Sequence, residues 1–71
     1  MFMKMKQPKR VRALLAERQK WLTIDEIAGG LRMHRNTVSK IINGKSIDPA
    51  TARKVAEAVN EDVMSIAEFV N

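Results

Sequence analysis

The 71-residue sequence predicts an all-α fold, a compact bundle of about five short helices. Apolar residues recur at helical spacing in five short segments, and residues suited to helix ends stand between these segments. No segment shows a clear strand pattern, and no internal repeat is present. A chain of this size buries only about 60% of its unfolded surface, so we expect one domain with a modest core.

The first predicted helix runs from Pro8 to about Lys20. Proline suits the first helical position, because its missing N–H would have no helical partner there. The residues expected on its inward side are Val11, Leu14, Leu15 and Leu22. Residues 1–7 have no helical period and are expected to form a flexible, basic and Met-rich tail before a domain at 8–71. The apolar side chains of this tail leave open that it packs on the domain or crosses a dimer.

The next two predicted helices form a helix-turn-helix at about residues 24–43. Thr23 and Glu26 form a capping box, so a helix is expected from about Ile24 to Gly30. The following helix is expected from Arg35 to Asn43, and Gly44 ends it because glycine tolerates a positive φ. The apolar residues of the pair are Ile27, Ala28, Leu31, Val38, Ile41 and Ile42.

Two further helices are predicted after residue 47. Asp48 is suited to the N-cap and Pro49 to the first position of a helix that continues to Asn60. Its apolar stripe consists of Ala52, Val55, Ala56 and Val59. A last short helix is expected from Asp62, with Val63, Ile66, Phe69 and Val70 on its buried or partner-facing side.

The charge of the chain is unevenly distributed. The net charge is +5, with residues 1–45 contributing +8 and residues 46–71 contributing −3. Such a polarised field would turn the basic half toward a polyanion. The alternative is that the charges simply keep a small domain soluble.

Several classes of function find no support in the sequence. There is no cysteine, and a single histidine cannot assemble a metal site, so no metal and no cofactor are expected. No Gly-rich phosphate loop and no nucleophile with a matched base appear, so we expect no catalytic residues and no enzyme. The chain lacks a membrane-length apolar run and a signal-peptide pattern, which predicts a cytoplasmic protein, bacterial or phage-encoded.

The segment Leu22–Lys45 resembles the helix-turn-helix of the Cro and lambda-repressor-like family. The motif Glu26-Ile27-Ala28 matches the core of the first helix in that family, and Asn43-Gly44-Lys45 matches the turn that closes the recognition helix. Residues 36–43 also resemble the recognition helix of the lac-repressor family. The layout agrees over residues 8–70. The family often has Gly where Arg32 stands and Gln where Ile24 stands, and we expect Gly29 and Gly30 to absorb the geometry of the turn.

The resemblance implies a sequence-specific regulator that binds double-stranded DNA and is most simply a repressor. Arg35 and Asn36 match positions that enter the major groove, where Arg pairs with guanine and Asn with adenine. The full set of predicted base-reading residues is His34, Arg35, Asn36, Ser39 and Lys40. The alternative for Arg35 and Asn36 is solvation of the helix start. Lys40 serves a phosphate as readily as a base, and His34 is as consistent with a cap or a phosphate neighbour.

Other residues are expected to contact the DNA backbone, which fixes the register on the duplex without reading sequence. The predicted phosphate contacts are Thr23, Thr37, Asn43, Gly44 and Lys45. Lys4, Lys6, Lys9 and Arg10 are proposed as a basic DNA arm. A disordered tail with only nonspecific attraction is the equal alternative for the arm.

One module of this size offers few base contacts, so we expect a homodimer with recognition helices about 34 Å apart on a pseudo-palindrome. The predicted dimer interface is Met64, Phe69 and Val70, although these residues could instead complete the core. A competing hypothesis is an antitoxin-like or antirepressor module that binds a protein partner, since fold alone does not determine function. No small-molecule ligand is expected.

Overall fold

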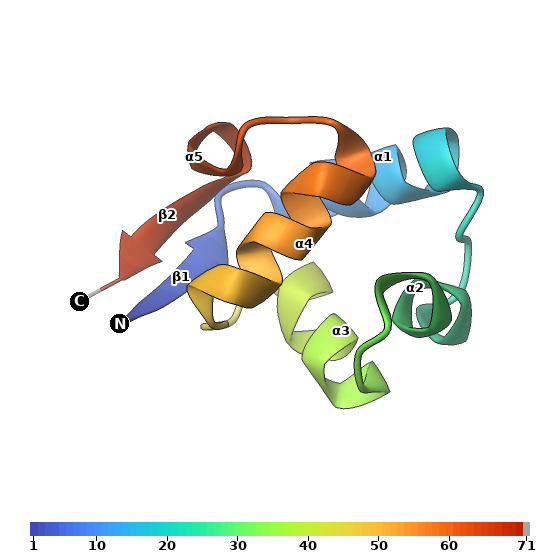
Figure 1. Ribbon diagram of the computed structural model, residues 1–71, viewed down its shortest axis with the longest axis horizontal. Coiled ribbons are helices and arrows are strands. Elements are labelled where there is room, and N and C mark those ends of the chain that lie inside the picture. Colours follow the sequence, from blue (N-terminus) through green and yellow to red (C-terminus); the bar gives the residue numbers. More distant parts are fainter. Residues whose placement is uncertain (71) are drawn as a thin grey trace.

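A computed structural model describes residues 1–70, in which five helices surround one core and the two ends of the chain pair as a small sheet (Figure 1). The helices are α1 (Pro8–Gln19), α2 (Ile24–Leu31), α3 (Arg35–Ile42), α4 (Pro49–Val59) and α5 (Val63–Ile66). The predicted mainly helical class is therefore confirmed. Each helix begins at the predicted residue or, for α5, one residue later. None of these helices is both long enough and apolar enough to cross a membrane.

Local signals explain the positions of the helix ends. The Thr23 hydroxyl accepts a hydrogen bond from the Glu26 N–H at 3.1 Å, and the Glu26 carboxylate accepts one from the Thr23 N–H at 3.0 Å. This capping box starts α2 as predicted. Beyond α3, Gly44 has φ +70° and its N–H bonds to the Ile41 carbonyl. Proline occupies the first position of both α1 and α4.

The sheet corrects two sequence predictions. Strand β1 (Phe2–Met5) pairs antiparallel with β2 (Ala67–Val70), and Met3 also bridges to Ile47. Residues 2–5 are thus not a flexible tail but a strand with Met3 and Met5 buried in the core. The helix predicted from Asp62 stops at Ile66, so Phe69 and Val70 lie on a strand instead. Pairing with β1 supplies backbone partners that an isolated four-residue segment lacks.

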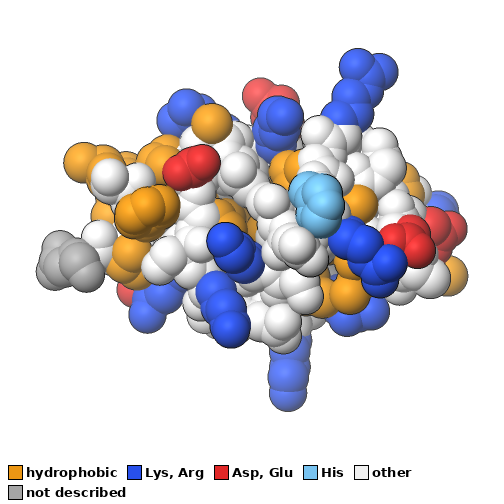
Figure 2. Space-filling model, turned by 90° about the horizontal axis from the view of Figure 1, so that it is seen from below, with side chains coloured by type: hydrophobic (Ala, Val, Ile, Leu, Met, Phe, Trp, Pro, Cys, Tyr) orange, Lys and Arg blue, Asp and Glu red, His pale blue; other side chains and the backbone are white. Residues whose placement is uncertain are grey.

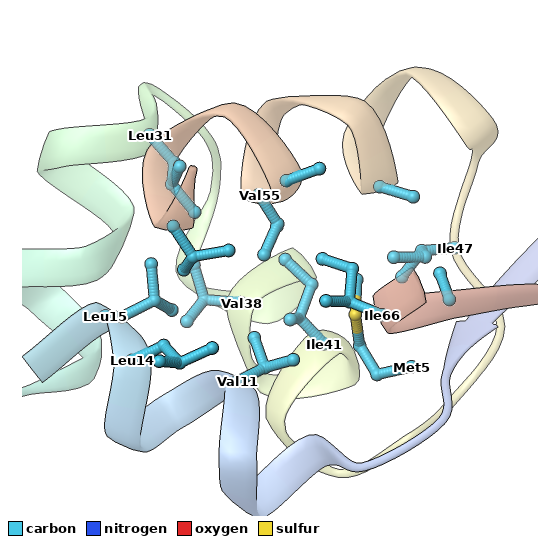
Figure 3. Packing of buried hydrophobic residues seen from close by; sticks show 14 of the residues in the cluster. Met5, Val11, Leu14, Leu15, Leu31, Val38, Ile41, Ile47, Val55 and Ile66 are labelled. Carbon is cyan, nitrogen blue, oxygen red and sulfur yellow. The ribbon is translucent and has the colours of Figure 1, made fainter. Parts of the chain in front are cut away.

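The core is formed by one apolar side from each element (Figure 3). The predicted stripe of α4, Ala52, Val55, Ala56 and Val59, is buried throughout. Figure 3 shows Val55 of α4 above Val38 and Ile41 of α3. Val11, Leu14 and Leu15 of α1 lie toward the lower left of the same view. The core therefore fixes one face of α3 and leaves the opposite face to solvent.

The connections beside α2 depart from expectation in two places. Leu22 is 65% exposed, because α1 ends at Gln19 and Lys20 adopts a left-handed conformation that takes Leu22 out of phase with the helix. Arg32 ends α2 with φ 56°, whereas Gly29 and Gly30 lie within the helix and do not absorb the turn. The space above Gly30 is instead filled by Trp21, whose ring would lie 2.2 Å from an added Cβ.

An ion-pair cluster joins α1 to the turn between α4 and α5. Arg18 lies 3.1 Å and Arg10 3.5 Å from the two carboxylate oxygens of Glu61. The hydrogen bond from Arg18, followed by the charge of Arg10, lowers the pKa of the Glu61 carboxyl below its usual value. Arg18 also donates to the Val59 carbonyl at the end of α4. This cluster stabilises the side of the bundle formed by α1 and α4.

Candidate nucleic-acid interface

Helix α3 has one fully buried face and one polar face. Val38 and Ile41 are 0% exposed and anchor the helix in the core. Arg35, Asn36 and Lys40 are exposed on the other side. Figure 2 views the molecule from below, the side on which α2 and α3 lie in Figure 1, and shows Lys and Arg side chains spread over this surface. An α-helix with this division can enter a groove without disturbing the core.

The start of α3 is fixed by its own N-cap. The Nδ1 atom of His34 accepts a hydrogen bond from the Asn36 N–H at 3.0 Å. The His34 carbonyl accepts from the N–H groups of Thr37 and Val38, which begins the helical ladder. The cap interpretation of His34 is therefore confirmed. Its ring remains exposed near the centre of the surface in Figure 2, so a DNA contact through the rest of the ring remains a prediction.

The structure places an acidic side chain beside Arg35 that the sequence analysis did not select. Arg35 Nη1 lies 3.5 Å from Asp25 Oδ1, and both side chains are largely exposed. Asp25 belongs to the first turn of α2, where its charge also favours the positive end of the helix dipole. The ion pair adds a direct link between α2 and the first residue of α3.

The neighbouring acid, Glu26, has a different task. Its carboxylate accepts hydrogen bonds from the N–H groups of Leu22 and Thr23, both at 3.0 Å. These two backbone bonds lower the pKa of the Glu26 carboxyl below its usual value. Glu26 is thus held by the backbone before α2, whereas Asp25 is turned toward Arg35.

Four of the five predicted phosphate contacts, all except Thr37, lie at the two ends of the helix-turn-helix. Thr23 is exposed at the start of α2, although its hydroxyl already accepts the capping hydrogen bond. Asn43 and Lys45 are exposed just after α3, and Gly44 between them is partly buried against Pro8. Thr37 and Ser39 are half-buried on α3. Contacts of these residues with DNA remain predictions.

The four residues of the predicted arm do not lie on a free tail. Lys4 is in β1, opposite Glu68 of β2. Lys6 donates to the Met64 carbonyl at 2.7 Å, and Arg10 in α1 pairs with Glu61. Lys9 is exposed in α1. Their positions in β1, in the turn that follows it and in α1 place these residues on the body of the protein rather than on an extended arm, and their contact with DNA remains a prediction.

The surface has the chemistry of a binding face. Within residues 1–70, no group of three or more His, Asp or Glu side chains is arranged to hold a metal ion. The described residues offer guanidinium, amide and ammonium donors on one rigid helix, supported by a neighbouring helix. Such an arrangement can bind base edges and phosphates.

Comparison with protein families agrees with the helix-turn-helix geometry of α2 and α3. Residues 11–64 match the family model described as Helix-turn-helix. No curated protein and no solved structure matches the chain. The matched region begins within α1 and ends within α5, so it contains the whole α2–α3 unit.

Proposed function

The chain belongs to the helix-turn-helix family of DNA-binding transcription regulators, and from this premise we propose that it is a Cro-like, phage-type repressor that binds a pseudo-palindromic operator as a homodimer. The observation that carries this proposal is the exposure of Arg35, Asn36 and Lys40 on the side of α3 away from the buried Val38 and Ile41. By occupying its operator, the protein would obstruct polymerase.

In this proposal α3 is the recognition helix. Arg35 donates two hydrogen bonds to O6 and N7 of a guanine, and the Asn36 amide pairs with N6 and N7 of an adenine. Lys40, farther along the exposed side, and Ser39 reach neighbouring bases or phosphates. The Thr23 region and the 43–45 loop lie at the two ends of the unit, where backbone N–H groups and Lys45 would fix the register by phosphate contacts.

We assign the dimer interface to the sheet end of the molecule, through Met64, Phe69 and Val70. Met64 is 45% and Phe69 is 50% exposed, so both leave apolar surface in contact with solvent. Both backbone groups of Met3 bond to Ile47, so the β1–β2 ladder uses Phe2 and Lys4 with Val70 and Glu68. The N–H and C=O of Phe69 therefore point to the outer edge of β2. A second copy would cover this edge and its apolar side chains.

The dimensions of the protomer agree with this arrangement. Its longest extent is 32 Å, with the sheet at one end and α3 nearer the middle (Figure 1). A two-fold axis at the sheet end would separate the two α3 helices by roughly one protomer length. Successive half-sites on one side of B-DNA are about 34 Å apart.

Two substitutions test the DNA-binding roles. Arg35→Ala is expected to lower affinity for the preferred sequence by about 1–3 kcal/mol and to relax base preference at one position. Lys45→Ala is expected to weaken binding to all sequences alike and to reduce the salt slope by about 1. Titration of specific and random duplexes over a salt series separates the two effects. Equal losses on random DNA for both variants would contradict the role given to Arg35.

A further inference from the structure

We propose that Asp25 is a positioning residue that makes Arg35 selective for guanine over phosphate. This inference rests on the proposed function, because it assumes that Arg35 reads a base. It begins from the 3.5 Å ion pair between Arg35 Nη1 and Asp25 Oδ1, which joins the first turns of α2 and α3. Asp25 lies outside the set of residues expected to contact DNA.

The first step is geometric. Glu26 is engaged by two backbone N–H groups, so Asp25 is the acid of this turn that is turned to Arg35. The contact is made through Nη1, which leaves donors on Nη2 and Nε for a second acceptor. A guanidinium has five N–H donors in a fixed plane, so one carboxylate does not saturate it. Asp25 therefore holds Arg35 at the start of α3 while donors stay available.

The second step is electrostatic. A phosphate that approached Arg35 would also approach the Asp25 carboxylate, and the two negative charges would repel each other. Guanine offers the same acceptor pattern through O6 and N7 but carries no net charge. A like charge placed against the unwanted partner is a common means of specificity. Asp25 thus disfavours the binding of Arg35 to a DNA phosphate. Hydrogen bonding to a guanine edge is then the more favourable contact for Arg35.

The structure also explains why a carboxylate is tolerated on a DNA-facing surface. Asp25 stands in the first turn of α2, where a negative charge is stabilised by the helix dipole. Its side chain is 75% exposed and packs on nothing in the core. Replacing its charge therefore leaves the fold intact, and any change in DNA binding reports on Arg35 or on net charge.

The test compares Asp25→Asn with Glu17→Gln, since both remove one negative charge. Glu17 is exposed on α1 and forms no ion pair among the described residues. The probes are the duplex selected by the wild-type protein and a random duplex of equal length, at about 0.15 M salt. Asp25→Asn is expected to lower the ratio of affinity for the selected duplex to affinity for the random duplex by about threefold to tenfold. It is also expected to relax base preference only at the base pair that Arg35 contacts. Glu17→Gln is expected to leave the ratio unchanged.

A double-mutant cycle locates the effect. In an Arg35→Ala background, Asp25→Asn is expected to change both affinities by the same factor. In the wild-type background, Asp25→Asn and Glu17→Gln could change affinity for the selected and the random duplex by the same factors. Asp25 would then contribute only net charge, and the inference would be overturned while the proposed function stands. A wild-type protein without any preferred sequence overturns the proposed function and this inference together.

Discussion

Gly29 and Gly30 of α2 are adjacent in sequence, but the structure predicts opposite effects when each is replaced by alanine. A Cβ on Gly29 meets no atom within 4 Å. A Cβ on Gly30 would lie 2.2 Å from two atoms of the Trp21 ring, closer than real Cβ contacts occur. Trp21 packs against the core, so its ring cannot move away without losing contacts.

The expected magnitudes follow from this difference. Glycine within an exposed helix costs up to about 1 kcal/mol relative to alanine, so Gly29→Ala is expected to stabilise the protein by about 0.5–1 kcal/mol. Gly30→Ala gains the same amount but displaces Trp21, and overpacking typically costs about 1–3 kcal/mol. The net effect is a destabilisation of about 1 kcal/mol. For a domain of this size each kcal/mol shifts Tm by about 4–8 °C.

Thermal and urea unfolding measure the free energy of unfolding of the two variants. Trp21 is the single tryptophan, so its fluorescence reports whether its ring is displaced. Gly30→Ala is expected to alter the emission of Trp21 in the folded state, whereas Gly29→Ala leaves it unchanged. In a Trp21→Ala background both glycine replacements should stabilise. An equal stabilisation by both variants in the wild-type background would refute the packing of Trp21 over Gly30.

The other predictions concern a turn, an ion pair and the sheet edge. Arg32→Gly is expected to stabilise the fold by up to about 1 kcal/mol in urea unfolding, because Arg32 has φ 56° where glycine is unstrained; a loss of stability would show that the side chain matters more than the turn. The pKa of Glu61 is lowered in the folded state, so its stabilisation is present above the usual carboxyl value of 4.5 and lost as pH falls through the lowered value. Glu61→Gln should therefore flatten the acid side of a Tm-against-pH profile, and an unchanged profile would exclude this linkage. Phe69→Asp should shift the protein toward monomer in analytical ultracentrifugation with its fold retained, whereas an unchanged dimer would move the interface elsewhere.

Much of the helical architecture was predictable because its signals are local. The reciprocal hydrogen bonds of Thr23 and Glu26 depend on a spacing of three residues, and proline at a first helical position depends on a single residue. The buried face of α3 followed from helical periodicity alone. These features need no knowledge of the rest of the chain.

The sheet was missed because its information is distant. Strands β1 and β2 are four residues each and come from opposite ends of the chain. In addition, Ile66, Phe69 and Val70 continue the helical spacing of α5, so the sequence favoured a longer helix over a strand. Pairing with β1, together with burial of Met3 and Met5, makes a strand more stable than a helix for residues 67–70.

The site was predictable in outline but not in its pairing. The exposed position of Arg35 follows from the phase of α3, yet its contact with Asp25 depends on how the turn between α2 and α3 brings their first turns together. The left-handed conformation of Arg32 is part of that turn. The departure from the family pattern at this residue pointed to the right position, although the neighbouring glycines did not compensate for it.

In the proposed function, α3 reads a DNA sequence as part of a symmetric dimer. The most direct measurement is selection of bound duplexes from a random-sequence pool by the purified protein at about 0.15 M salt, where nonspecific attraction is screened. We expect enrichment of two inverted half-sites whose centres are one helical turn apart. A well-folded protein that enriches no motif would contradict this proposal and point instead to a protein-binding role for this helix-turn-helix.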